Sequence, residues 1–189
     1  MPKIIENAGE RLLDELELMF RENDGEISLR RLAARAGVAV GTIYNYFPDK
    51  DDLIKSLFQR EWGQAVGRIM GALDGVSVDA GQRELAGVVV DVVYGDVERI
   101  SRSGESRRSL MCRDERNTRP YPLRPEGWKW LGGAFVPVWD RVFPDGRPDA
   151  ERLTVALIVT AHRLVALFPD ERTANIEFLT DRIAQGERG

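Results

Sequence analysis

Polar and basic side chains gather between residues 27 and 50, and their types suit contact with a nucleic acid. Four neighbouring positions hold hydroxyl, phenol or amide groups: Thr42, Tyr44, Asn45 and Tyr46. The segment has a single acid, Asp49, against four bases: Arg30, Arg31, Arg35 and Lys50. Hydroxyl and guanidinium groups donate to phosphate oxygens, and an amide can pair with the edge of adenine. These residue types indicate a local DNA-contacting surface in a chain whose net charge is −4.

Two short helices joined by a tight turn would position these groups. Apolar residues at helical spacing predict a first helix within residues 28–37, and Gly37 suits a left-handed cap at its end. Ile43 and Phe47, four residues apart, predict a second helix over residues 40–47, which Pro48 ends. Asp49 then suits the N-cap of a third helix, with Asp52 completing a capping box. This is a helix-turn-helix pattern, whose second helix enters the major groove.

The segment ISLRRLAARAGVAVGTIYNYFPDK, residues 27–50, resembles the DNA-binding signature of the TetR/AcrR family of transcriptional regulators. The resemblance lies in the Ala-x-x-Ala-Gly-Val turn, the Gly-Thr-hydrophobic-Tyr-x-Tyr-Phe run and the lysine that opens the next helix. It implies that Thr42, Tyr44 and Lys50 clamp phosphates and that Tyr46 adds a backbone contact. It also implies base-edge contacts from Val40, Gly41 and Asn45, with Arg30 and Arg31 in reach of the DNA backbone.

Two features depart from the family pattern. Ala39 stands where many members have a serine that caps the recognition helix, and Val40 stands where many have a base. The segment before residue 22 is also unusually acidic, so an N-terminal arm in the minor groove is not expected. These departures keep open an alternative, in which the chain is a helical small-molecule-binding or interaction protein with a degenerate head.

Helical periodicity runs through the rest of the chain and predicts an all-α fold of about nine helices. We expect a DNA-binding domain over residues 1–48 and an effector-binding and dimerisation domain over residues 49–189. Residues 153–168 are apolar nearly all round, which is typical of a helix buried on more than one side. A partner subunit is the simplest cover for it, so we expect a homodimer through the last two helices.

The central helices carry the candidate effector contacts. Their aromatic side chains, with a histidine, a methionine and an arginine, could line a pocket: Tyr94, Met111, Arg113, Trp128, Phe135, Trp139 and His162. The same spacing also suits plain core packing, and His162 suits a core or interface position. A series of arginines between residues 99 and 124 is either a solvated surface or an attraction for an anionic effector.

The inventory of reactive side chains argues against an enzyme. One histidine and the lone Cys112 build none of the usual metal sites, and no phosphate-binding glycine loop or nucleophile elbow occurs. We expect no metal, no cofactor, no membrane span and no secretion signal, and a reducing cytoplasm suits the single cysteine. The expected function is ligand-responsive repression: a homodimer grips palindromic operator DNA, and a small-molecule effector releases it.

Overall fold

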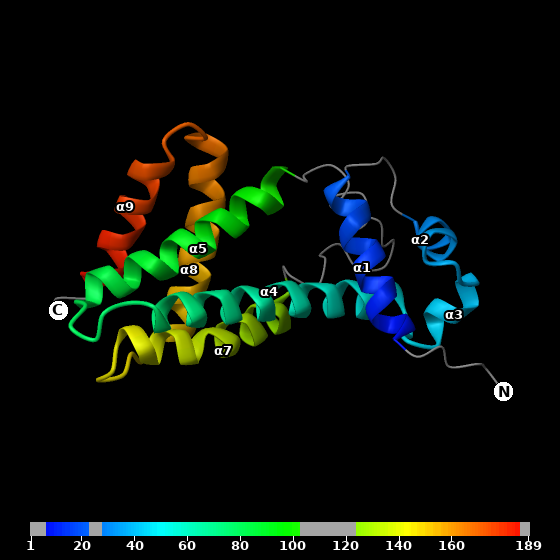
Figure 1. The fold of residues 1–189 in the computed structure, drawn as a ribbon, viewed down its shortest axis with the longest axis horizontal. Helices are drawn as coiled ribbons and strands as arrows, with labels where there is room; N and C mark the ends of the chain where they lie inside the picture. The colour runs from blue at the N-terminus through cyan, green and yellow to red at the C-terminus, as the bar shows by residue number, and fades with distance from the viewer. Residues whose placement is uncertain (1–6, 23–27, 103–123, 186–189) are drawn as a thin grey trace. The chain divides into compact units, whose positions relative to one another are not determined.

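The computed structural model describes residues 7–22, 28–102 and 124–185. Within these residues it contains eight helices and no strand: α1 (Ala8–Arg21), α2 (Leu29–Ala36), α3 (Val40–Tyr44), α4 (Lys50–Asp74), α5 (Gln82–Arg102), α7 (Pro125–Val142), α8 (Ala150–Leu167) and α9 (Arg172–Ala184) (Figure 1). The all-α expectation is confirmed. The chain between residues 103 and 123, with Cys112, lies outside the described residues.

The chain divides into two compact units. The first unit comprises residues 1–60 and 103–127, and the second comprises residues 61–102 and 128–189. The helix α4 begins in the first unit and continues into the second. The expected boundary after residue 48 stays a prediction.

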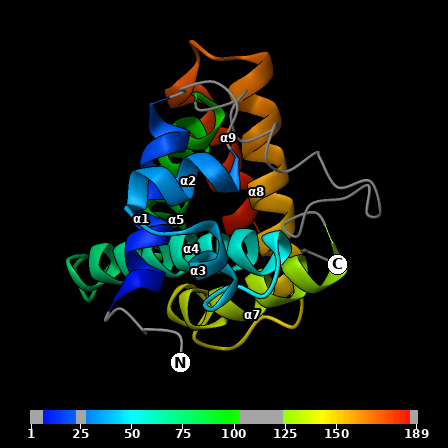
Figure 2. The ribbon, with the colours of Figure 1, turned by 90° about the vertical axis from the view of Figure 1, so that its right-hand side faces the viewer.

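The first unit has its own apolar core between α1, α2, α3 and the start of α4. It is formed by one face of α1, by residues of the other three helices and by Phe47 between α3 and α4: Leu12, Leu13, Leu16, Met19, Phe20, Leu32, Ala33, Ala36, Ile43, Phe47, Leu53, Ile54 and Leu57. Figure 2 shows α1, α2 and α3 from the side of this unit. Burial of this shared surface fixes the short helix α3, which is too short to be stable alone.

The second unit is held by aromatic packing along α7. Phe135 lies with its ring centroid 6.0 Å from that of Trp62 and 6.4 Å from that of Trp139. The indole nitrogen of Trp139 donates to the hydroxyl of Thr154 on α8 at 2.7 Å, so this buried ring has its polar atom satisfied. Pro137 stands inside α7. Where α7 meets α8, a Cβ on Gly132 would lie 2.9 Å from that of Glu151, so only glycine fits there.

A buried polar contact joins α9 to α5. The side-chain amide of Asn175 donates one hydrogen bond to the Tyr94 hydroxyl at 2.8 Å and another to the Phe168 carbonyl at 2.9 Å. Figure 1 shows α8 and α9 packed on α5, which agrees with the contacts among these three helices. The amide therefore ties the α8–α9 turn to the centre of the unit.

Helix α8 buries one face and leaves apolar side chains on another. The buried face contains Leu153, Thr154, Leu157, Ile158 and Ala161. Val159, Leu167 and Phe168 are exposed, and Leu167 is 68% exposed. No helix in the described ranges is long and apolar enough to cross a membrane.

Candidate nucleic-acid interface

Local sequence signals set the two helices of the interface. The Ser28 hydroxyl accepts from the backbone amide of Arg31 at 3.3 Å and caps α2. At the other end, Gly37 adopts φ 67°, the left-handed conformation predicted for it. The amide of Val38 donates to the carbonyl of Ala33 at 2.9 Å, which closes the turn toward α3.

Helix α3 is shorter than expected and has no cap at its start. It ends at Tyr44 rather than continuing to Phe47, although the Phe47 amide still donates to the Ile43 carbonyl at 2.9 Å. No side-chain hydrogen bond caps it, because the methyl side chain of Ala39 has no polar atom. The next helix does have its predicted cap: an Asp49 carboxylate oxygen accepts from the Asp52 amide at 2.8 Å.

Burial separates the side chains of α3 into two groups. Ile43 is buried in the core of the first unit, and Phe47, just beyond the helix, is buried with it. Tyr44 is 49% exposed, and Gly41 and Asn45 are also exposed. This exposed group is what a helix lying in a major groove would present.

The remaining predicted contact residues are placed differently. Val40 and Tyr46 are partly buried and pack against the core of the first unit. Thr42, Arg31 and Lys50 are half-buried, while Arg30 is exposed on α2. The nine predicted residues thus lie on α2, on α3 and the two residues that follow it, and at the start of α4, and their roles at DNA stay predictions.

Arg35, on α2, binds acidic side chains of α1 and of the residue that follows it. Its guanidinium hydrogen-bonds both carboxylate oxygens of Glu22 and, through Nε at 3.0 Å, Glu15. The hydrogen bonds that Arg35 donates to Glu22 and then to Glu15 raise the pKa of Arg35, and the hydrogen bond from the Arg35 guanidinium lowers the pKa of Glu22. Arg11 adds a second link, donating from Nη2 to the Ala36 carbonyl at 3.0 Å. The acids of the first helix, which the sequence left unexplained, therefore serve in part to hold α2.

The predicted effector residues are divided between core and intermediate positions. Tyr94, Phe135 and Trp139 are buried in the second unit, and the last two are in contact. Trp128 and His162 are half-buried, and the His162 Nδ1 lies 3.4 Å from the Ser101 hydroxyl. Met111 and Arg113 lie outside the described residues, with most of the arginine series. Within the described part of the chain, no cluster of three or more potential ligands could hold a metal.

The sequence of this interface matches known regulators. Residues 16–57 match the family described as bacterial regulatory proteins, tetR family. The chain is 37% identical over 54 residues to a fatty acid metabolism regulator protein of Bacillus subtilis, covering 29% of this chain and 28% of that protein. It is 46% identical over 43 residues to an HTH-type transcriptional regulator of Haemophilus influenzae, covering 23% of each chain. The chain therefore spans about a quarter of the length of these curated relatives.

Solved structures resemble the whole fold. A TetR-family transcriptional regulator from Streptomyces coelicolor superposes with a TM-score of 0.63 at 19% identity, over 94% of this chain and 98% of that chain. The fatty acid degradation regulator FadR from Bacillus halodurans gives 0.64 at 18% identity, over 95% and 99%. At these identities the likeness concerns the fold, including the helices that follow the matched N-terminal segment.

Proposed function

We propose that this chain is a transcriptional regulator of the tetR kind, because its residues 16–57 match the family described as bacterial regulatory proteins, tetR family. It would repress transcription as a homodimer on a palindromic operator. A small molecule bound by residues 49–189 would weaken the grip of residues 1–48 on DNA. The cytoplasm is the proposed location, because the operator would lie on the chromosome there.

The exposed side of α3 carries the proposal for DNA binding. Tyr44 and Asn45 are exposed while Ile43 is buried beside them, so the helix is anchored by one face and presents polar groups on the other. We assign Thr42, Tyr44 and Lys50 to phosphates, with Tyr46, Arg30 and Arg31 as further backbone contacts. The remaining three, Val40, Gly41 and Asn45, are assigned to base edges. Two such helices one DNA turn apart, ~34 Å, would read a palindrome.

The exposed apolar side chains of the last two helices support a dimer. Val159, Leu167 and Phe168 of the α8 segment are exposed, and so is Phe178 of α9. Large apolar side chains left exposed on a single chain favour an interface that covers them. Leu167→Glu would therefore lower the sedimentation mass from dimer to monomer at micromolar concentration, whereas a wild-type monomer would exclude this part of the proposal.

For the effector we propose a site among the central helices. Trp128 and His162 are half-buried and are the predicted contacts most open to a ligand, with Tyr94, Phe135 and Trp139 forming the core beneath. The coupling between effector and DNA is typically worth about 1–3 kcal/mol, or 5–150-fold in affinity. A screen in which no compound changes operator affinity would count against a ligand-responsive regulator.

The uncapped start of α3 favours one second candidate, a helical ligand-binding or interaction protein whose head does not bind DNA. An N-cap is worth about 1 kcal/mol, so α3 is less firmly formed than a capped helix. Binding to a specific duplex distinguishes the candidates, because only the regulator requires it.

The test is selection from fragments of the source genome, followed by fluorescence anisotropy on the recovered duplex at two salt concentrations. We expect the affinity to fall steeply with salt. The logarithm of the association constant should fall linearly with the logarithm of the salt concentration, with a slope of about −0.9 for each phosphate neutralised. Tyr44→Phe should weaken binding and Tyr44→Ala should abolish it, with thermal stability kept because the ring is half-exposed. Val78→Ala is the control, since Val78 is exposed in the turn before α5. Failure to enrich any fragment over scrambled DNA would support the second candidate.

A further inference from the structure

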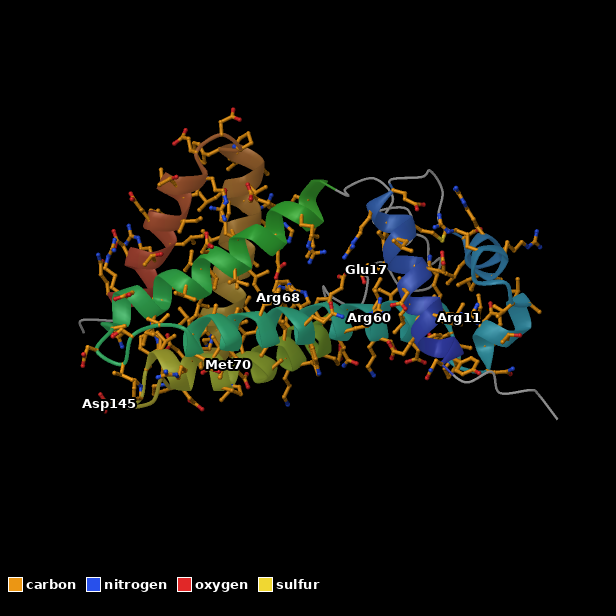
Figure 3. All side chains as sticks on the ribbon, viewed as in Figure 1. Arg11, Glu17, Arg60, Arg68, Met70 and Asp145 are labelled. Atoms are coloured by element: carbon orange, nitrogen blue, oxygen red, sulfur yellow. The ribbon has the colours of Figure 1, made fainter. Side chains whose placement is uncertain are left out.

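The guanidinium of Arg60 binds three carboxylates of another helix. Arg60 lies on α4, and its Nη1 is 2.6 Å from Asp14 Oδ1 and 3.5 Å from Glu10 Oε2. Its Nη2 is 3.0 Å from Glu17 Oε2. The Arg60 and Glu17 side chains are only 14% and 15% exposed, so their contact is partly shielded from water, whereas Asp14 and Glu10 are mostly exposed. Figure 3 labels Arg60 and Glu17 between α4 and α1.

The three acids form a stripe along α1. Positions 10, 14 and 17 are separated by four and three residues, which places their side chains on one face of a helix. Like charges at this spacing repel one another, so the stripe by itself destabilises α1. Arg21 pairs with Glu17 one turn further along. Removing Arg60 would take its guanidinium away from all three carboxylates, of which Glu17 would keep its pair with Arg21.

The same helix α1 also contacts α2, the first helix of the helix-turn-helix. Arg11 donates to the Ala36 carbonyl at the end of α2, and Arg35 binds Glu15 and Glu22. Polar links therefore run from α4 through Arg60 to α1, and from α1 to α2. The apolar core between these helices is non-directional, whereas a planar guanidinium with several partners fixes both distance and angle.

We infer that Arg60 is a positioning residue that sets the orientation of α1 on α4, and through α1 the direction in which α3 points. This rests on the proposed function, since the orientation matters only if two recognition helices must meet two half-sites. Arg60 is the last residue of α4 that belongs to the first unit, and α4 continues from there into the second unit. Arg35 differs: it ties α2 to α1 within the head and leaves the α1–α4 angle unchanged.

The experiment compares half-site spacings. The full chain is titrated with the selected palindrome, with a duplex holding one half-site, and with palindromes whose half-sites are one base pair closer or further apart. We expect Arg60→Met to lower affinity for the natural palindrome by about tenfold, a typical size for coupling through a positioning contact. Affinity for the single half-site should stay within about twofold of wild type. The Arg60→Met variant should bind the palindromes with natural, closer and wider half-site spacing with similar affinity.

Matched variants separate positioning from stability. Arg83→Met removes an equal charge from the ion pair with Asp181 in the second unit and should leave every affinity unchanged. Arg35→Met should weaken the half-site and the palindrome equally, because it acts on the head alone. The double variant Asp14→Asn with Glu17→Gln removes the two nearer of the three partner carboxylates and should reproduce Arg60→Met. It also supplies the measurement if Arg60→Met does not fold.

Two results would overturn the inference. If wild type binds the palindrome and the variants lacking the Arg60 contacts keep its spacing preference, Arg60 has no positioning role while the proposed function stands. If wild type binds no duplex specifically, the proposed function fails and the inference fails with it.

Discussion

Loss of the Asn175 side-chain amide should destabilise the second unit strongly. Asn175 is buried, and its amide donates to the Tyr94 hydroxyl at 2.8 Å and to the Phe168 carbonyl at 2.9 Å. Asn175→Ala removes both hydrogen bonds and leaves the fully buried Tyr94 hydroxyl without this donor. A net hydrogen bond is worth about 1 kcal/mol, and a stranded buried polar group costs about 1–3 kcal/mol. The expected loss of unfolding free energy is about 2–4 kcal/mol.

A double-mutant cycle isolates the Tyr94–Asn175 contact. Tyr94→Phe removes the acceptor and leaves one amide hydrogen unpaired, at an expected cost of about 1–2 kcal/mol. The double variant should lose less than the sum of the two single variants, with a coupling free energy of about 1 kcal/mol. Urea unfolding followed by circular dichroism gives each value, at one protein concentration because a dimer's stability depends on concentration. Glu177→Ala, an exposed position on α9, is the control and should change stability by less than about 0.5 kcal/mol.

The outcome also bears on the effector prediction for Tyr94. If the losses of unfolding free energy in the two single variants simply add in the double variant, the argument from the buried hydrogen bond is refuted. The Tyr94 hydroxyl would then not stabilise the fold through Asn175, and a role in effector binding would be the remaining explanation for it. A clear coupling would place the hydroxyl in the structure of the unit.

Three further outcomes follow from single positions. Gly132→Ala should cost about 1–3 kcal/mol, because its Cβ would meet Glu151 at 2.9 Å. Gly133→Ala, which meets nothing within 4 Å, should gain up to about 1 kcal/mol in the same urea experiment, and equal effects at the two positions would contradict the close helix approach. Ala39→Ser should cap α3 and stabilise it by about 1 kcal/mol, raising DNA affinity; no change in either would show that this end needs no cap. A hydrogen bond from Arg147 lowers the pKa of Asp149. The ionised carboxylate therefore stabilises the fold fully above the ordinary aspartate pKa of about 3.9. This stabilisation is lost as the pH falls through the lowered pKa. Asp149→Asn should therefore be less stable than wild type at pH 7 and equal to it at the acid end, and a difference that persists there would refute this reading.

Local signals in the sequence predicted the head well. Gly37 ends α2 in the left-handed conformation, and Asp49 caps α4 by accepting from a backbone amide three residues on, both as predicted. Each of these signals depends only on residues close by in the sequence. The end of α3 was predicted less well, because the apolar spacing of Ile43 and Phe47 continues beyond the helix. The backbone keeps one helical hydrogen bond there, so Phe47 is still buried although α3 has ended.

Contacts between residues far apart in the sequence could not be predicted. The acids of α1 were visible as an excess of charge, but nothing local indicates that Arg60, at a distance of 43 to 50 residues, is their partner. Tyr94 was recognised as a pocket candidate, and its hydrogen bond to a residue 81 positions away was not. Periodicity shows which face of a helix is apolar, whereas partner choice depends on how the helices cross.

The placement of the aromatic side chains gives the two units separate optical signals. All four tryptophans, Trp62, Trp128, Trp130 and Trp139, belong to the second unit, and Trp62 and Trp139 are buried beside Phe135. The helix-turn-helix contains tyrosines and no tryptophan. Emission excited in the tryptophan band therefore reports directly on the second unit, so a titration with a small molecule can be followed there without a label. Motion of the recognition helix needs its own dye or the DNA itself as reporter.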